Sequence, residues 1–291
     1  MKLLTIDSRD HAGRPGVLLD DAHILDLGAA PATLSESHWV PHSVVSVLAA
    51  GSDGLDRLRE LVRKVEAQSA ADRASLIDDG VVLPFETTAL LAPVRRPGLI
   101  LVADPVGQTE YIKSPNTAVG NATTITIPQW LEAGLIAQVM LAVVIDRPLY
   151  RGSVADAEQA IAAYTLLVDL SARAPVESAA VTEWQAWLAT KQFPGSCPVG
   201  PALITADSLI DVAATTMAVT VNGVPVASGP PVPGHGVIAD SLSRVSKRYA
   251  LRAGDLVGIC PPQGEFAIPL RVGDRVAVTL DASMELSFAV A

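Results

Sequence analysis

The sequence predicts an α+β protein in which a small N-terminal α+β module, residues 1–92, precedes a larger strand-rich domain, residues 93–291. Short apolar or β-branched runs of strand length recur along the chain, and two helical patterns lie between residues 44 and 65. The proline-rich segment Pro93–Pro97 separates the two parts. With 291 residues, 49% of them hydrophobic, the chain is long enough to bury the core that this organisation needs.

The N-terminal module begins with three short apolar runs, and Asp20-Asp21 stands where a hairpin turn is needed. A short helix is expected at Val44–Ala50, with Gly51 as its stop. A second helix is expected around Leu55–Val65, where apolar residues recur at helical spacing opposite Arg and Glu. The three expected strands are Lys2–Ile6, Gly16–Leu19 and His23–Leu27.

The second domain is expected to be mainly strands. A helix is expected at Val154–Ala163 with Ser153 as its N-cap, and another at Ile238–Tyr249. Asn222-Gly223 is the strongest hairpin signal in the chain. The expected strands are Leu99–Ala103, Thr123–Ile127, Gln138–Ile145, Ala202–Thr205, Ala213–Val221, Val224–Ala227, Asp255–Ile259, Arg275–Leu280 and Leu286–Val290.

Charge and composition exclude several classes of function. The net charge of -10 and the pI of about 4.9 argue against a nucleic-acid partner. No apolar run is long enough for a membrane span, and the first residues turn polar too early for a signal peptide, so we expect a cytoplasmic protein. Cys197 and Cys260 are too few for a disulfide framework or a zinc site. Neither a phosphate-binding loop nor a dinucleotide fingerprint is present.

Several segments, in a shared order, carry a resemblance to a known family. Residues 138–145 read Q-V-M-L-A-V-V-I, and residues 164–173 read Y-T-L-L-V-D-L-S-A-R. They resemble the E-x-E-L-A-V-V-I and G-Y-T-x-x-N-D-x-S-A-R segments of the fumarylacetoacetate hydrolase family. Residues 111–120 resemble its F-x-K-P-x-S-x-x-x-G segment, and residues 187–200 its W-x-R-G-K-x-F-D-x-x-C-P-x-G segment. The resemblance extends over nearly the whole chain.

The resemblance implies a rolled mixed β-sheet core, a small N-terminal domain and a homodimer. In the family, the two glutamates and the aspartate bind a divalent metal. Here Gln138 and Met140 stand at the glutamate positions, and only Asp169 remains. The segment in which the family places a catalytic histidine contains none here, at Asp104–Thr109. Because hard divalent cations need several oxygen ligands and a thioether does not suit them, we expect no metal and no other cofactor.

Three residues are candidates for catalysis: Lys191, Asp169 and Gln138. Asp169 and Lys191 could form an acid–base or substrate-polarising pair, and Gln138 could donate a hydrogen bond to a carbonyl. The alternative is structural: Asp169 is a buried carboxylate paired with Lys191 or Arg173, and Gln138 is satisfied by backbone.

Seven residues are candidates for contacting the substrate. Lys113 could stabilise an enolate or carboxylate, and Met140 could make the pocket apolar. For Trp187 and Phe193, core packing is the commoner role, and His235 is a reserve general base whose alternative is a surface loop histidine. The set is Lys113, Met140, Gln108, His235, Gln263, Trp187 and Phe193.

Three functions remain open from the sequence, in this order. The first is a metal-independent enzyme for an enolisable or polyketide-like small molecule, catalysing cyclisation, isomerisation or cycloaddition in natural-product biosynthesis. The second is a divalent-metal-dependent hydrolase, decarboxylase or isomerase of small oxo-acids, and the loss of two of three carboxylates weighs against it. The third is a non-catalytic small-molecule-binding protein.

Overall fold

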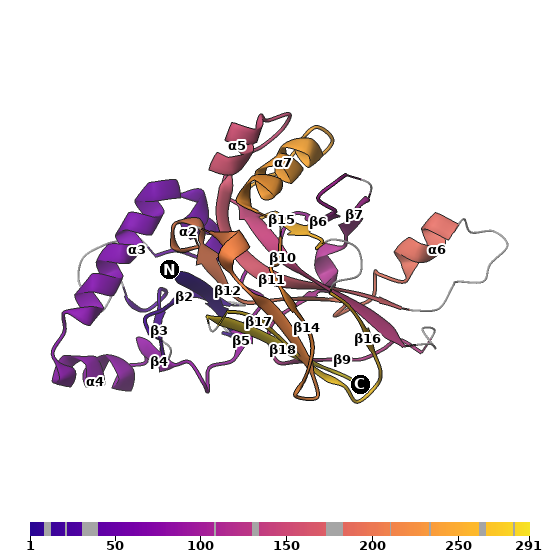
Figure 1. Cartoon of the computed structure of the whole chain (residues 1–291). Coiled ribbons are helices and arrows are strands. Elements are labelled where there is room, and N and C mark those ends of the chain that lie inside the picture. Colours follow the sequence, from indigo (N-terminus) through magenta and orange to yellow (C-terminus); the bar gives the residue numbers. More distant parts are fainter. Residues whose placement is uncertain are drawn as a thin grey trace.

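A long mixed sheet and a smaller sheet form the body of the protein, and helices lie at the ends and edges (Figure 1). The computed structural model describes residues 1–8, 13–20, 22–30, 40–107, 109–129, 134–172, 183–209, 211–232, 234–261, 266–281 and 283–291. Within them, the first sheet runs in the order β4-β3-β2-β1-β12-β11-β10-β15-β6-β7, and the second in the order β14-β13-β17-β18-β9. The α+β class and the family-like mixed sheet expected from the sequence are confirmed.

The N-terminal strands continue the large sheet. β1 (Lys2–Ile6) pairs antiparallel with β2 (Arg14–Leu18) on one side and with the core strand β12 (Cys197–Thr205) on the other. Next come β3 (His23–Asp26) and β4 (Val82–Pro84), while β5 (Leu90–Leu91) pairs with the end of β1. The N-terminal part and the core therefore share one hydrogen-bonded sheet, and a domain boundary at residue 92 stays a prediction.

Two long strands form the centre of the sheet. β10 (Leu135–Ile145) pairs antiparallel with β11 (Ile161–Ala172), and nearly every residue of both is buried. Their side chains alternate between two hydrophobic clusters, one on each face of the sheet. Leu141 and Leu166 lie in one cluster, whereas Met140 and Leu167 lie in the other. Burial on both faces explains why these strands read as continuous apolar runs.

Shorter strands complete both sheets. The central pair is flanked by β15 (Leu256–Ile259), β6 (Ile100–Ala103) and β7 (Glu110–Lys113), with β16 (Ala267–Leu270) beside β10 and β8 (Ala118–Val119) beside β12. The second sheet contains β9 (Thr123–Ile125), β13 (Met217–Val221), β14 (Val224–Gly229), β17 (Arg275–Leu280) and β18 (Met284–Val290). Asn222 and Gly223, with φ of 54° and 79°, form the expected turn between β13 and β14.

Six α-helices lie in the described part of the chain. In the N-terminal part these are α2 (Val44–Ala49), α3 (Gly51–Glu66) and α4 (Ala70–Asp78). In the core they are α5 (Val154–Gln159), α6 (Glu183–Ala189) and α7 (His235–Ser246), and α5 packs against α7. Short 3-10 turns lie at Pro115–Thr117, Ala206–Ser208 and Val212–Ala214.

The structure corrects two of the expected elements. The helix that begins after the Ser153 cap ends at Gln159, and Ile161–Ala163 already belong to β11, because these buried apolar residues continue the central strand. The strand expected at Ala213–Val221 begins at Met217, because Asp211 caps a 3-10 turn over Val212–Ala214. The helix α4 was not expected; its single buried residue, Leu76, leaves almost no amphipathic pattern.

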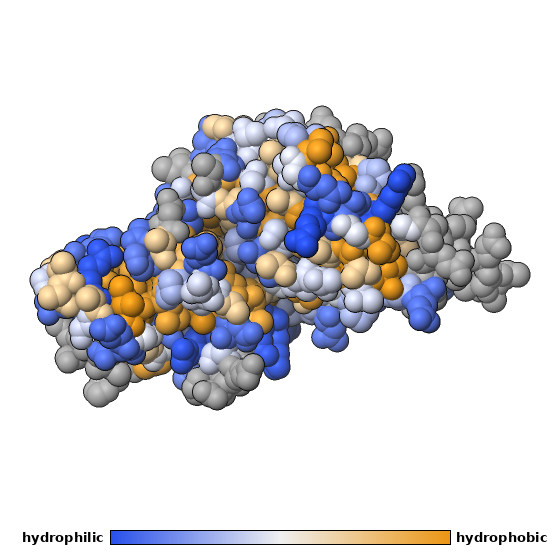
Figure 2. Space-filling model, turned by 90° about the horizontal axis from the view of Figure 1, so that it is seen from below, coloured by the Kyte–Doolittle hydropathy of each residue, from blue (hydrophilic) through white to orange (hydrophobic). Residues whose placement is uncertain are grey.

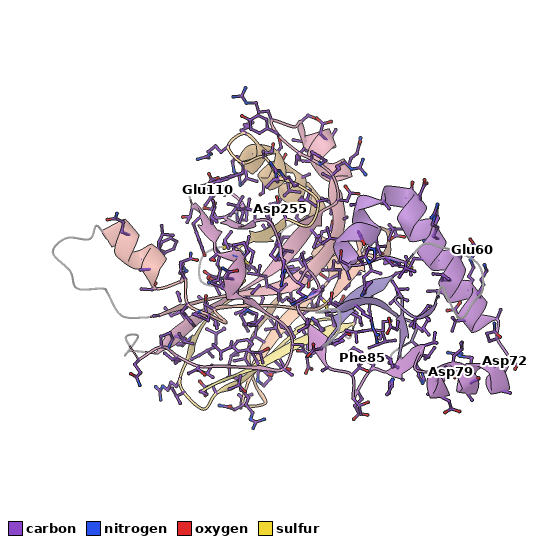
Figure 3. All side chains as sticks on the ribbon, turned by 180° about the vertical axis from the view of Figure 1, so that it is seen from behind. Glu60, Asp72, Asp79, Phe85, Glu110 and Asp255 are labelled. Carbon is purple, nitrogen blue, oxygen red and sulfur yellow. The ribbon has the colours of Figure 1, made fainter. Side chains whose placement is uncertain are left out.

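The surface is mixed and acidic. Figure 2 shows one face, on which hydrophobic side chains gather over the N-terminal part at the left, among hydrophilic ones. Glu60 on α3, Asp72 on α4 and Asp79, the C-cap of α4, lie at the end of the molecule that carries these two helices (Figure 3). Among the described residues, no helix is long and apolar enough to cross a membrane.

Gly120 lies where the backbone of another segment approaches it closely. A Cβ at this position would lie 2.6 Å from the carbonyl carbon of Leu91 and 2.7 Å from the nitrogen of Ala92. We therefore expect Gly120→Ala to lower the free energy of unfolding by about 1–3 kcal/mol, measured by urea denaturation. The control is Gly236→Ala in α7, where a Cβ meets nothing within 4 Å and a gain of up to about 1 kcal/mol is expected. Equal effects of both changes would contradict this interpretation.

Candidate active site

Asp169 is the centre of a buried cluster of charged side chains. It lies on β11 and has no exposed surface. Its Oδ1 accepts a hydrogen bond from Nζ of Lys113 at 2.6 Å, and its Oδ2 accepts one from Nζ of Lys191 at 2.7 Å. The hydroxyl of Tyr111 also donates to Oδ2. These four residues, Tyr111, Lys113, Asp169 and Lys191, are called the Asp169 cluster below.

Three separate segments supply the cluster. Tyr111 and Lys113 alternate along β7 and therefore lie on the same face of that strand. Lys191 follows α6 and precedes β12. Nζ of Lys113 also donates to the backbone oxygen of Lys191 at 2.6 Å, and the hydroxyl of Ser196 donates to the same oxygen at 2.8 Å. Lys113 thus connects β7, on which it lies, with β11 of the central sheet and with the segment that carries Lys191.

The cluster keeps Asp169 ionised and Tyr111 protonated. Burial by itself raises the pKa of Asp169, but the charges of Lys113 and Lys191 and their hydrogen bonds outweigh it and hold that pKa below its usual value. The pKa of Tyr111 is raised far above its usual value, first by burial and then by the charge of Asp169. Burial also raises the pKa of the Cys197 and Cys260 thiols to about 12, so neither is a nucleophile near neutral pH.

Two aromatic rings fix the position of Lys191. The rings of Tyr111 and Trp187 meet edge to face, with centroids 4.8 Å apart and an angle of 82° between their planes. Nζ of Lys191 lies 4.7 Å from the centroid of Trp187 and 5.1 Å from that of Tyr111, within the range of cation–π attraction. The Lys191 side chain is 7% exposed, whereas those of Lys113 and Asp169 are fully buried. Of the three charged side chains of the cluster, that of Lys191 is therefore the one with some exposed surface.

Gln138 lies directly opposite Asp169. The two residues are register partners on β10 and β11, so their side chains lie on the same face of the sheet. The amide nitrogen of Gln138 is buried and has no hydrogen-bond partner among the described residues. An unsatisfied buried donor costs about 1–3 kcal/mol, which an oxygen atom of a ligand would recover.

The donor atoms at this site do not fit a divalent metal. Both oxygens of Asp169 already accept hydrogen bonds from ammonium groups, and Gln138 offers only a neutral amide. Met140 is fully buried, and its Sδ would lie 2.6 Å from a Cβ at Gly258. Among the described residues, no group of three or more His, Cys, Asp and Glu side chains could hold an ion. Two adjacent ammonium groups would also repel a cation.

The other residues that the sequence predicts at the site lie in different parts of the molecule. Trp187 contacts the cluster, whereas Met140 and Phe193 are buried in opposite hydrophobic clusters. Gln108 and Gln263 lie outside the described residues, as does the side chain of His235 at the start of α7. Their contacts with a substrate stay predictions. Tyr111 was missed as a site residue, although it stands two positions before Lys113 in an alternating strand pattern.

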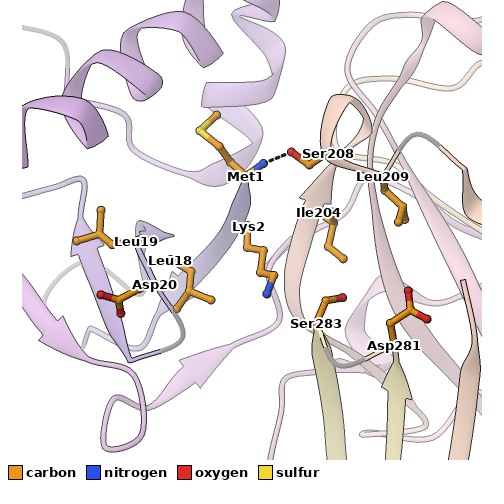
Figure 4. A pocket seen from close by; sticks show the side chains of 10 residues that line it. All are labelled: Met1, Lys2, Leu18, Leu19, Asp20, Ile204, Ser208, Leu209, Asp281 and Ser283. Atoms are coloured by element: carbon orange, nitrogen blue, oxygen red, sulfur yellow. Dashed lines mark hydrogen bonds between the residues drawn. The ribbon is translucent and has the colours of Figure 1, made fainter. Parts of the chain in front are cut away.

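Four hollows of the surface lie away from the Asp169 cluster, since none of its residues lines them. One of about 410 Å³ is lined by residues of β1 and β2 and of the segments around Ser208 and Asp281 (Figure 4). At its rim the α-amino group of Met1 donates to the hydroxyls of Thr205 and Ser208. This hollow combines the opposite charges of Lys2, Asp20 and Asp281 and has no buried catalytic group like the cluster.

Comparison with protein families now identifies the chain. Residues 101–291, about two thirds of the 291 residues, match the model of the fumarylacetoacetate (FAA) hydrolase C-terminal domain. The chain belongs to the fumarylacetoacetate hydrolase family. The matched segment includes the whole Asp169 cluster, Gln138 and Met140.

Relatives of this fumarylacetoacetate hydrolase family member are named as enzymes. Oxaloacetate tautomerase YisK of Bacillus subtilis is 26% identical over 294 residues, 94% of each chain. Human mitochondrial oxaloacetate tautomerase FAHD2A is 28% identical over 249 residues, 77% of this chain and 76% of the relative. The crystal structure of maleylpyruvate hydrolase from Sphingobium sp. SYK-6 has a TM-score of 0.72 at 22% identity and covers 100% of this chain and 99% of its own, which shows the shared fold.

Proposed function

We propose that this protein is a metal-independent enzyme that isomerises a small enolisable oxo-acid at the Asp169 cluster. One observation carries the proposal: Lys113, Lys191 and Asp169 are in direct contact and almost wholly buried, and their charges sum to +1. A buried uncompensated charge is costly, and one anion bound beside Lys191 would neutralise it. The carboxylate or enolate of an oxo-acid is such an anion.

Each residue at this site has a separate role in the proposed reaction. Lys191 donates a proton from its ammonium group to the carbon of a bound enol, and its amine then takes the proton of the enol hydroxyl. This returns Lys191 to its starting state and converts the enol to the ketone. Asp169 stabilises the ammonium form, Lys113 holds the Lys191 backbone in place, and the Gln138 amide donates to the substrate carbonyl or enolate oxygen.

The substrate class is supported by the relatives as well as by charge. Of cyclisation, isomerisation and cycloaddition, which the sequence left open, isomerisation agrees with two relatives named as oxaloacetate tautomerases. A polyketide-like substrate and a role in natural-product biosynthesis remain narrower predictions, as do the homodimer and the cytoplasmic location. The metal-dependent hydrolase or decarboxylase is disfavoured by the donor atoms around Asp169.

The proposal predicts activity that does not depend on metal. We expect the purified protein to accelerate the enol–keto conversion of oxaloacetate, followed by the near-ultraviolet absorbance of the enol, at the same rate in excess EDTA as in millimolar Mg²⁺ or Mn²⁺. Each rate is compared with the spontaneous rate in the same buffer, because metal ions alone promote enolisation.

Two outcomes would overturn the proposal. Loss of activity in EDTA with recovery on adding Mn²⁺ would show that Asp169 has metal co-ligands, and C–C bond cleavage of acylpyruvates would become the reaction to assay. A rate no faster than the spontaneous one with oxaloacetate and with other 2-oxo acids would favour a non-catalytic binding protein.

A further inference from the structure

A second basic site lies where the N-terminal part meets the core. A hollow of about 350 Å³ is lined by Thr5, Pro15 and the start of α2 from the N-terminal side, and by Pro93, Arg95, Arg96 and Ala253-Gly254 from the core side. We call it the junction hollow. It shares no lining residue with the Asp169 cluster. Its volume lies within the usual range for a small-molecule site.

The charges that line the junction hollow are all of one sign. Arg95 and Arg96 line it together with His42 and the hydroxyl-bearing Ser43, and no acidic residue is among the lining residues. Within the described residues, neither guanidinium group makes an ion pair or a hydrogen bond, whereas Arg14, Arg59, Arg147 and Arg248 all pair with carboxylates. Both arginines are exposed, and in a chain of net charge -10 they place two neighbouring positive charges at one concave place with no acidic residue in its lining.

Contacts around the junction hollow hold its walls in place. A Cβ at Gly13, whose φ is 111°, would lie 3.4 Å from Cδ of Arg95, so the stem of Arg95 packs against the Gly13 backbone. On the other wall, a Cβ at Gly254 would lie 2.9 Å from Cγ1 of Val45, which leaves no gap between α2 and the turn before β15. The hydroxyl of Thr5 donates to the backbone oxygen of Pro93 at 2.8 Å. The site is therefore built from both parts of the chain.

We propose that the junction hollow binds a small molecule bearing a phosphate or diphosphate group. A guanidinium group presents donors in a planar fork that matches phosphate oxygens, and two such groups match the charge of a phosphate dianion. The imidazole of His42 and the hydroxyl of Ser43 add polar contacts at the same wall. Because the ligand contacts both parts of the chain, its binding also stabilises their junction. This inference does not depend on the proposed isomerase activity.

Titration calorimetry with inorganic pyrophosphate at fixed ionic strength tests the proposal. We expect saturable one-to-one binding to the wild-type protein and at least about tenfold weaker binding to the double variant Arg95→Ser/Arg96→Ser. The double variant Arg271→Ser/Arg275→Ser removes the same charge elsewhere and is expected to bind like the wild type. Lys191→Met removes one ammonium group of the Asp169 cluster and is also expected to leave pyrophosphate binding unchanged.

The results of this titration distinguish binding in the junction hollow from binding at the Asp169 cluster. Equal affinity of the wild type and the Arg95/Arg96 variant would overturn the proposal, as would the absence of saturable binding to the wild type. Loss of binding in Lys191→Met would assign the anion to the Asp169 cluster instead. Circular dichroism of each variant, with an unchanged spectrum expected, shows that any loss of binding is not a loss of fold.

Discussion

Replacing Lys191 with methionine is expected to lower the rate of oxo-acid isomerisation by about 100-fold or more, which is the usual contribution of a positioned acid–base group. Methionine keeps most of the length and apolar surface of the side chain but removes the ammonium group that contacts Asp169 at 2.7 Å. Because the proposed proton transfer runs through Nζ of Lys191, kcat falls, and KM rises as well because the excess positive charge that attracts the substrate anion is removed. Steady-state kinetics with oxaloacetate measure both.

Two further variants show whether Lys191 acts directly. Lys191→Arg keeps the charge but holds its proton too tightly to shuttle it, so the affinity for the substrate is expected to survive while kcat stays low. Lys247→Met changes an exposed lysine at the end of α7 and is expected to leave the kinetics unchanged. If Lys191→Met turned over at the wild-type rate, Lys191 would be a structural counter-ion and the proposed chemistry would be wrong.

Replacing Asp169 with asparagine is expected to cost about 3–5 kcal/mol of folding free energy, because it leaves two buried ammonium groups without their counter-charge. The amide can still accept one hydrogen bond, but it cannot neutralise Lys113, whose side chain is fully buried. Urea denaturation of the wild type and the variant measures the difference. The matched control is Asp56→Asn, which breaks a surface pair with Arg59 and is expected to cost no more than about 1 kcal/mol.

The effect of Asp169 on stability depends on pH with a definite sign. Its pKa is lowered in the folded protein, so its contribution to stability is present above the unfolded value of about 4 and is lost as the pH falls through the folded value. The stability difference between the wild type and Asp169→Asn is therefore expected to be largest near neutral pH and to shrink in acid. A difference independent of pH would mean that the carboxylate charge does not stabilise the fold.

Part of the site could be predicted from the sequence because its residues lie on regular elements. The apolar run Gln138–Ile145 was expected as a strand and is part of β10, whereas no strand was expected at β11. The lone carboxylate of Asp169 in an apolar run needs a buried counter-ion. Lys191 was expected as its partner and is. Lys113 was expected to face a substrate, yet its ammonium group donates to Asp169, 56 positions away in the chain. Pairing between distant segments depends on sheet order, which local patterns do not show.

The other differences between the expected and the observed structure also arise from pairing between distant segments. Tyr111 lay in no expected strand and was given no role, and only the place of β7 in the sheet order brings its hydroxyl to Asp169. Ile161–Ala163 have a composition that suits either a helix or a strand, and the pairing of Ala163 with Val144 decides for the strand. In both cases tertiary contacts overrode the local pattern. Elements with strong local signals, such as the Asn222-Gly223 turn, were predicted correctly.

The pairing of β1 with β12 also sets the order in which the sheet can be completed. Lys2 lies opposite Ile204 and Leu3 opposite Leu203, so β1 is synthesised about 200 residues before its core partner. Until that partner is synthesised, the apolar β1 has only the strands of the N-terminal part, β2 and the short β5, to pair with. Closing so long a loop is slow, and we expect the last step of folding to be the joining of the N-terminal strands to the core.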